Sequence, residues 1–203
     1  MIRSSPPFLL TFAFLSVASI LQPPHRFGAV AQMTKHHAAN LRDAGVIPDV
    51  IDNFDPQVQI RITYDSLLIT PGATILPHQG VHMPQVTLEG SQPGHLYTLF
   101  MSDPDAPSPE HPSHREYLHW IVSNIPGGAN DIAEGTEVVP YAPPTPPQGT
   151  HRYVLTVMEQ PGTNPMTVRR PAQRGGFRTR TFGKEAGMDV VGATFFKAAH
   201  QSK

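Results

Sequence analysis

Carboxylate, imidazole and phenol side chains gather in three short segments of this 203-residue chain. The segments are DPDAPSP at 103–109, REYLHW at 115–120 and GTHRY at 149–153. Their candidate site residues are Asp103, Asp105, His119, His151 and Tyr153. Imidazole N–H and phenol O–H groups are donors that can surround a tetrahedral anion such as phosphate. Because the set lacks an obvious nucleophile, it indicates that the protein binds an anion and is not an enzyme.

The carboxylates have a role in this interpretation. A carboxylate bonded to one imidazole nitrogen fixes the tautomer and favours the charged ring, which strengthens binding of an anion. Pro104 and Pro107 pre-set φ in the DPDAPSP loop, so little entropy is lost on binding. Each segment alone has a simpler explanation, since DPDAP is a good turn sequence and His119 in an apolar strand is commonly a core residue. Their occurrence together in one domain favours the site.

Periodicity predicts the strands that must position these side chains. The predicted strands cover residues 58–64, 85–88, 96–101, 117–125 and 151–158. The stretch YAPPTPPQ at 141–148 is predicted to be irregular because proline lacks the N–H that a strand ladder needs. Helices are predicted at 34–44 and 176–187, and a short helix or strand at 193–200. The fold class is therefore mainly β, one domain of two packed sheets with a few short peripheral helices.

Strand alternation predicts which side chains can meet. His119 and Tyr117 are expected on one face of the 117–125 strand, and Leu118 and Trp120 on the opposite face. The near-continuous apolar character of this strand predicts that both of its faces are covered.

The 151–158 strand is expected to carry the partners of His119. His151 and Tyr153 are predicted to share one face, from which Arg152 points away. If the two strands are neighbours, His119 converges with this pair at one end of a sheet, and the Asp103 loop approaches them. Arg152 and, similarly, Arg180 are predicted to pair with carboxylates inside the domain.

Composition excludes several classes of protein. A net charge of −1 argues against broad capture of nucleic acid, and 23 Pro with 16 Gly favours a turn-rich β fold. With 15% charged and 39% hydrophobic residues, the chain is expected to be globular. The absence of Cys excludes disulfides, thiolate metal sites and a Cys nucleophile.

The N-terminus resembles a targeting segment. Residues 8–21 form an apolar run of the length of a signal-peptide core, and Ala29-Val30-Ala31 fits cleavage before Gln32. Residues 1–31 are therefore assigned to a signal or transit segment and residues 32–203 to the folded domain, with secretion as the favoured location. An organelle transit peptide, a membrane anchor, or a true start at Met33 with a cytoplasmic location are the alternatives.

Four ordered motifs resemble the phosphatidylethanolamine-binding protein family, which includes Raf-kinase inhibitor proteins and plant flowering-time proteins. The motifs are DPDAPSP at 103–109, REYLHWIVSNIPGG at 115–128, GTHRY at 149–153 and GGFRTRTF at 175–182. VGATFF at 191–196 matches as well, and the resemblance spans residues 46–203. It implies a Greek-key β-sandwich with a small anion pocket at one end.

The resemblance also implies a site and partners. By motif position the pocket residues are Asp103, Asp105, Pro107, His119, Tyr141, His151 and Tyr153, with Tyr141 at the pocket mouth. The implied ligand is a phosphate or phospholipid headgroup, with no cofactor, and the implied protein partner is a kinase or protease. Peripheral contact with a membrane stays open. The proline-rich 143–147 loop departs from the glycine-containing loop of animal members, and 162–174 does not resemble the external loop of the flowering-time branch.

Two other functions compete with this interpretation. The protein can be an inhibitor of a protease or kinase that acts through its surface, independently of the pocket. Metal-dependent hydrolysis is a weaker alternative, because Pro112 precludes a helical pair of His111 and His114 and no HExxH or GxSxG motif occurs. Arg169, Arg170 and Arg174 are expected to form a solvated basic loop that is too small to be a membrane patch.

Overall fold

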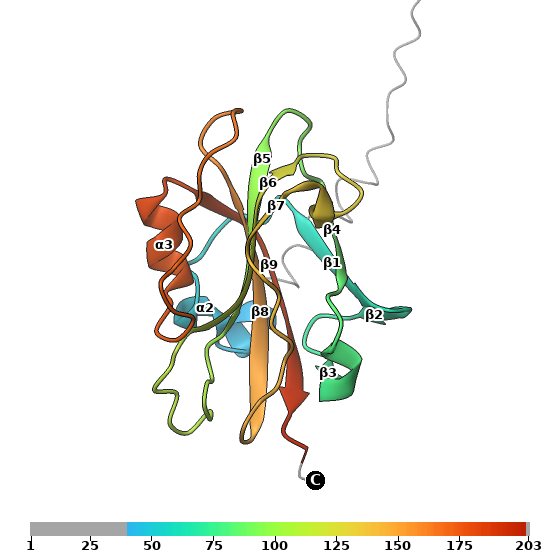
Figure 1. Ribbon diagram of the computed structural model, residues 1–203, viewed down its shortest axis with the longest axis vertical. Coiled ribbons are helices and arrows are strands. Elements are labelled where there is room, and N and C mark those ends of the chain that lie inside the picture. Colours follow the sequence, from blue (N-terminus) through green and yellow to red (C-terminus); the bar gives the residue numbers. More distant parts are fainter. Residues whose placement is uncertain (1–39, 202–203) are drawn as a thin grey trace, which may run out of the picture.

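The computed structural model describes residues 40–201, which form two β-sheets packed face to face (Figure 1). The larger sheet has six strands in the order β3-β9-β8-β5-β6-β7, and the smaller has three in the order β2-β1-β4. The larger sheet consists of β3 (Thr74–Ile75), β5 (Leu96–Asp103), β6 (Tyr117–Pro126), β7 (Thr136–Val139), β8 (Thr150–Glu159) and β9 (Asp189–Ala199). The smaller sheet consists of β1 (Gln59–Tyr64), β2 (Leu67–Ile69) and β4 (Gln85–Glu89).

Short helices flank the sheets. They are α2 (Val46–Asp49), η1 (Pro77–Gly80), η2 (Ile132–Glu134) and α3 (Thr179–Glu185). In Figure 1, α3 lies on one side of the large sheet and the small sheet lies on the other. Within the described residues, no helix is long and apolar enough to cross a bilayer.

The main hydrophobic core fills the space between the two sheets. Alternate residues of β1 point inward, as its burial pattern shows, and meet apolar side chains of the larger sheet. This core includes Ile60, Ile62, Val86, Leu88, Leu99, Met101, Trp120, Leu155, Val157 and Phe196. A fully buried side chain of this size contributes about 1.5–3 kcal/mol, so this layer is a principal source of stability.

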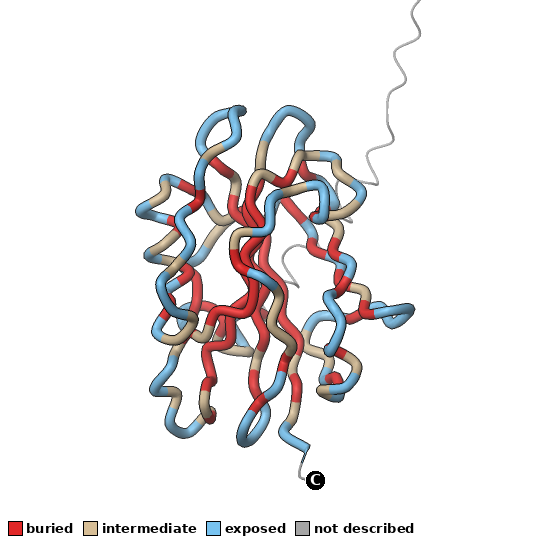
Figure 2. The backbone as a smooth tube through the Cα atoms, in the orientation of Figure 1, coloured by how far each residue is buried: buried red, intermediate tan, exposed pale blue. Residues whose placement is uncertain are grey.

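The outer face of the larger sheet is covered as well. One cluster joins Phe100, Leu118 and Ile121 to Phe177 and the partly buried Phe182 near α3. A second cluster covers the same sheet with residues of the 41–51 segment. The central strands are therefore buried on both faces (Figure 2), which confirms the prediction from the continuous apolar run.

The fold class and the five long predicted strands are confirmed. The 176–187 helix is confirmed as α3, and the segment left open between helix and strand is part of β9. Strands β2, β3 and β7 were missed, because runs of two to four residues are too short to show a period. Most of the predicted 34–44 helix and the whole of the predicted 1–31 targeting segment lie outside the described residues, although 40–43 is helical.

The predicted alternation along β6 is confirmed from Tyr117 to His119, whose rings are in edge contact, and is wrong from Trp120 onward because the strand contains bulges. Met101 lies opposite Trp120 and Ser102 lies opposite Leu118, so His119 is an extra residue with no opposite partner on β5. A bulge turns following residues to the other face. As a result His119 and Trp120 both face the small sheet, where the rings contact Tyr153 and Tyr141 respectively. Leu118 packs on the outer face.

Candidate anion-binding site

Asp103 and His151 form a buried pair where β5 ends and β8 begins. The Nδ1 of His151 donates to Oδ2 of Asp103 at 2.7 Å, and Nε2 donates to the carbonyl oxygen of Gln148 at 2.9 Å. Burial alone would lower the pKa of His151, but the hydrogen bond and charge of Asp103, together with the Gln148 carbonyl, raise it. Since both ring nitrogens face acceptors, the ring is an imidazolium.

His119 is held in the opposite protonation state. Its Nδ1–H donates to the carbonyl oxygen of Ala142 at 2.8 Å, which fixes the tautomer of the neutral ring. Only 5% of His119 is exposed, and burial lowers its pKa below the usual 6.5. Nε2 of His119 has no hydrogen-bond partner among residues 40–201, and it is not one of the fully enclosed unpartnered atoms there. Its lone pair is therefore in contact with solvent.

Tyr153 connects the two histidines. Its ring lies 5.1 Å from His119 in an edge arrangement and 6.5 Å from His151 in a stacked one, measured between ring centroids. Burial, assisted by the charge of Asp103, raises its pKa, so the phenol is protonated. Like Nε2 of His119, its hydroxyl has no partner within the described residues and is not fully enclosed. The hydroxyl is thus a free donor beside a free imidazole nitrogen.

Asp105 faces away from these groups. Its carboxylate accepts from Arg152 at Nε (2.9 Å), Nη2 (2.6 Å) and the backbone N–H (2.8 Å). Burial opposes ionisation, but the Arg152 hydrogen bonds and charge lower the pKa of Asp105. Arg152 also donates to Asp49 at 2.9 Å and to the carbonyl of Ala44 at 2.7 Å. Asp105 therefore ties the DPDAPSP loop to β8, and the predicted pairing of Arg152 with a carboxylate is confirmed.

Tyr141 supports the site from the side of the small sheet. Its hydroxyl donates to the carbonyl oxygen of Gly80 at 2.7 Å and lies 2.9 Å from the hydroxyl of Tyr64. Burial raises the pKa of Tyr141 to about 12. A Cβ on Gly80 would lie 2.5 Å from Cγ of Pro144, so only glycine permits this close approach of η1 to the proline-rich loop.

Pro107 is half-buried in the loop that begins at Asp103, and the Ala106–Pro107 peptide is cis. The loop is stabilised internally, because Oδ1 of Asp103 accepts the backbone N–H of Asp105 at 2.8 Å. The structure thus brings Asp103, His119, His151 and Tyr153 together. It places Asp105, Tyr141 and Pro107 around them as supports.

Three contributors were missed from the sequence. The carbonyl groups of Ala142 and Gln148 orient the two histidines, and no sequence signal marks a backbone carbonyl. Arg174, expected to be solvated, donates to the carbonyl oxygens of Leu118 (3.0 Å), His119 (2.9 Å) and Pro140 (2.7 Å). It therefore stabilises the bulge that presents His119, which the expectation of a solvated basic loop overlooked.

The alternative of metal-dependent hydrolysis requires a set of metal ligands. Across residues 40–201 no group of three or more His, Asp or Glu side chains is placed to hold a metal ion. A cavity of about 250 Å³ lies beside α3, and none of the predicted site residues lines it. The site is therefore a small cluster of polar groups at the end of the sheet, with one free acceptor nitrogen and one free hydroxyl.

The chain has clear sequence relatives. Residues 65–196 match the sequence profile described as phosphatidylethanolamine-binding protein. Protein TWIN SISTER of FT from Arabidopsis thaliana is 39% identical over 158 residues, which cover 77% of this chain and 89% of that protein. Protein MOTHER of FT and TFL1 homolog 2 from Oryza sativa subsp. japonica is 44% identical over 138 residues, covering 68% and 78% respectively.

Solved structures agree at the level of the fold. The phosphatidylethanolamine-binding protein from Plasmodium vivax superposes with a TM-score of 0.71 at 23% identity, covering 81% of this chain and 97% of that one. A carboxypeptidase Y inhibitor, solved in complex with its cognate proteinase, has a TM-score of 0.74 at 22% identity, covering 83% and 97%. With the profile match and the sequence relatives, these similarities show that the chain belongs to the phosphatidylethanolamine-binding protein family.

Proposed function

We propose that the protein binds phosphate-bearing headgroups at the cluster of His119, Tyr153, His151 and Asp103. The observation that supports this most directly is the pair of unpartnered polar atoms, Nε2 of His119 and the hydroxyl of Tyr153, at adjacent rings. A phosphate monoester carries a proton that titrates near pH 6. It can therefore donate to or protonate Nε2 while one of its oxygens accepts from the phenol.

The charges around the site favour a modest affinity. The imidazolium of His151 is neutralised by Asp103, and the guanidinium of Arg152 by Asp105 and Asp49. Among the described residues, the cation left near His119 is Arg174, which donates only to backbone carbonyl oxygens and whose charge adds to the effect of burial in lowering the pKa of His119. A bound anion therefore gains further positive charge only if His119 is protonated. We expect a dissociation constant on the order of 1 mM for a free headgroup, which corresponds to about 4 kcal/mol.

Binding without catalysis is the second part of the proposal. A nucleophilic enzyme needs a hydroxyl or thiol within hydrogen-bond reach of its base. Three of the four imidazole nitrogens of His119 and His151 instead donate to carbonyls and a carboxylate, and Nε2 of His119 has no hydroxyl within hydrogen-bond reach among the described residues. These contacts orient rings and do not activate a nucleophile.

A protein partner is the third part, and the ligand in the pocket would modulate its binding. The alternative, inhibition of a protease or kinase through the surface alone, draws on the fold it shares with the carboxypeptidase Y inhibitor. The two ideas differ in one respect: substitutions in the pocket would change partner binding only in the first.

Titration calorimetry of the full chain with phosphorylethanolamine tests the headgroup site. We expect saturable binding that disappears in His119→Ala and weakens about ten-fold in Tyr153→Phe, which removes one hydroxyl donor. Tyr97→Phe is the matched control, because it also removes a buried tyrosine hydroxyl. Tyr97 lies at the start of β5, and its hydroxyl accepts a hydrogen bond from the backbone N–H of Gln92.

Parallel titration with inorganic phosphate distinguishes a headgroup from free phosphate. Tighter binding of phosphorylethanolamine would identify the amine-bearing headgroup as the ligand, and equal binding would identify the phosphate alone. Absence of heat with folded wild-type protein at concentrations well above 1 mM, about the expected dissociation constant, would contradict the proposal.

A further inference from the structure

The cavity beside α3 is separate from the headgroup site. Its volume is about 250 Å³, and segment 169–185 supplies every residue that lines it. It lies on the outer face of the larger sheet, where Phe177 and Phe182 pack against Phe100. The headgroup cluster lies on the other face, toward the small sheet. The two sites therefore do not share a lining residue.

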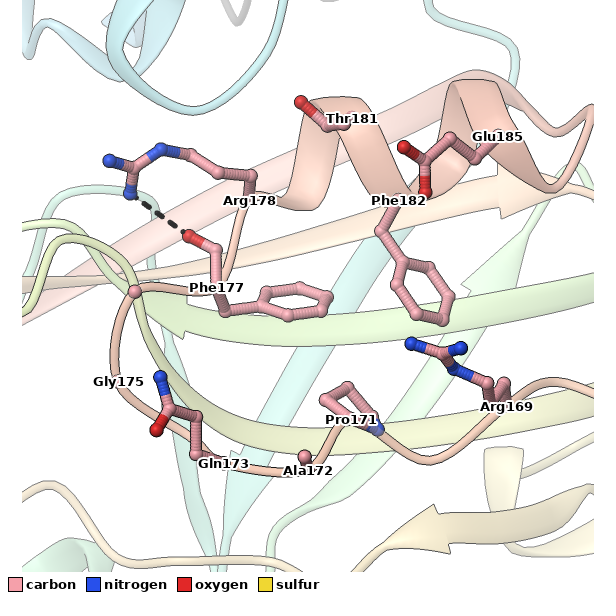
Figure 3. A pocket seen from close by; sticks show the side chains of 11 residues that line it. Arg169, Pro171, Ala172, Gln173, Gly175, Phe177, Arg178, Thr181, Phe182 and Glu185 are labelled. Atoms are coloured by element: carbon pink, nitrogen blue, oxygen red, sulfur yellow. Dashed lines mark hydrogen bonds between the residues drawn. The ribbon is translucent and has the colours of Figure 1, made fainter.

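The cavity has an apolar centre between two cations. Figure 3 shows the rings of Phe177 and Phe182 facing the hollow, with Arg178 beyond one end and Arg169 at the other. The two rings lie 5.3 Å apart between centroids. Such a hollow is below the size of typical drug-like pockets but sufficient for one apolar side chain.

Within the described residues the arginines at this cavity form no ion pair, although burial raises the pKa of the Glu116 carboxyl and the charge of Arg178 acts to lower it. Within residues 40–201, Arg169 and the neighbouring Arg170 make no hydrogen bond or ion pair, and Arg178 donates only to the carbonyl of Phe177 at 3.1 Å. Elsewhere on the surface, by contrast, Arg61 and Arg180 are paired with Glu89 and Asp52. Among the described residues that line the cavity, Glu185 is the only acidic one. Uncompensated guanidinium groups favour an anionic partner because they bind carboxylates in a forked geometry.

The cavity is held in shape before anything binds. Phe177 and Glu116 exchange two backbone hydrogen bonds of 2.9 Å each, and Gly176 N–H donates to the carbonyl of His114 at 3.1 Å. The carboxylate of Glu116 accepts the N–H of Thr179 at the start of α3 at 3.0 Å. A preformed pocket loses little entropy on binding, so even a small contact area can give measurable affinity.

We propose that this cavity docks an acidic segment of a protein partner, with one apolar side chain seated in the hollow against the rings of Phe177 and Phe182 and carboxylates on both sides of it. The hollow has room for one apolar side chain, which would be the anchor of the interface, as a buried hot-spot residue is. The unpaired arginines at opposite ends set the flanking charge. Electrostatic attraction of this kind speeds association and is screened by salt.

The test uses the full chain and a fluorescein-labelled peptide with the sequence Glu-Asp-Glu-Phe-Glu-Asp-Glu. Anisotropy is expected to show binding that weakens about ten-fold in the Arg169→Glu, Arg178→Glu double variant, because two contacts become repulsive. A peptide with Ser in place of Phe is expected to lose a similar factor. Ala172→Trp, which fills the hollow from an exposed position, should abolish binding.

Arg61→Glu is the matched control, since it reverses an exposed charge on the small sheet. It should leave peptide binding within about two-fold of wild type, and thermal melts check that every variant folds. Equal binding of the Phe and Ser peptides, or full binding by the double variant, would overturn the proposal. No binding to wild type would overturn it too. Binding of phosphatidylserine vesicles lost in the double variant, with no peptide binding, would assign the patch to a membrane instead.

Discussion

The imidazole of His151 lies between two acceptors, with Nδ1 2.7 Å from Oδ2 of Asp103 and Nε2 2.9 Å from the carbonyl oxygen of Gln148. Both nitrogens must carry a proton to make both contacts. His151 thus neutralises Asp103 beneath the headgroup site, while His119 stays neutral and open to solvent. This division of roles between two buried histidines underlies the first two predictions.

Asp103→Asn is expected to lower the pKa of His151. The wild-type pKa is raised, so the pair stabilises the fold fully below the unfolded pKa of histidine, and this contribution is lost as pH rises through the folded pKa. We expect the variant to lose about 1.5–3 kcal/mol of stability at acidic pH and less at alkaline pH. NMR titration of the His151 ring gives the pKa, and denaturation across pH gives the stability. An unchanged His151 pKa in the variant would contradict the assigned pair.

Anion affinity is expected to rise as pH falls through neutrality. The pKa of His119 is lowered by burial in the free protein, and a bound anion would raise it, so binding takes up a proton. The increase should level off once His119 is protonated in the free protein. Sulfate is the suitable probe because, unlike phosphate, it does not titrate in this range. Calorimetry in buffers of different ionisation enthalpy measures the proton uptake, and a pH-independent affinity for sulfate would refute the role of His119.

Asp105→Asn is expected to destabilise the protein by about 2–3 kcal/mol, because a largely buried guanidinium loses the more buried of its two carboxylate partners and keeps only Asp49. The folded pKa of Asp105 is lowered, so its contribution is present above the unfolded pKa and is lost as pH falls through the folded pKa. Glu89→Gln, which removes the exposed partner of Arg61, is the control and should cost less than about 1 kcal/mol. Urea denaturation at neutral pH measures both, and equal losses would show that Asp105 does not anchor the loop.

Glu116→Gln is expected to reduce the change in the free energy of unfolding with pH, because it removes one titrating carboxyl. Burial raises the pKa of Glu116 despite its hydrogen bonds to Ser102 and Thr179. A raised carboxyl pKa means that stability falls as pH rises from the unfolded to the folded pKa. The amide can keep the hydroxyl contacts, because Ser102 and Thr179 can also accept hydrogen bonds. Unfolding curves at several pH values test this, and parallel profiles for the two proteins would disprove it.

The sequence by itself determined the fold class and pointed to the candidate site residues that the structure brings together. Long alternating or apolar runs marked β1, β5, β6 and β8, because strand periodicity is a local property. The pairing of His151 with Tyr153 on one face, opposite Arg152, followed from the same period. The motif order indicated the family, which the profile match and relatives confirmed.

Only the tertiary structure decided which of these residues contact one another and which protonation state each histidine has. The bulge at His119 depends on its register against β5, and a shift of one residue reverses every face prediction beyond it. Asp105 binds Arg152 and not a pocket, and Tyr141 bonds to Gly80, because partners distant in sequence compete for each polar group. The neutral state of His119 follows from its burial, and the charged state of His151 from the carboxylate of Asp103, 48 residues away, and the carbonyl of Gln148. Such contacts exist only once the chain is folded, since hydrogen bonding and burial are properties of the assembled environment and not of residue type.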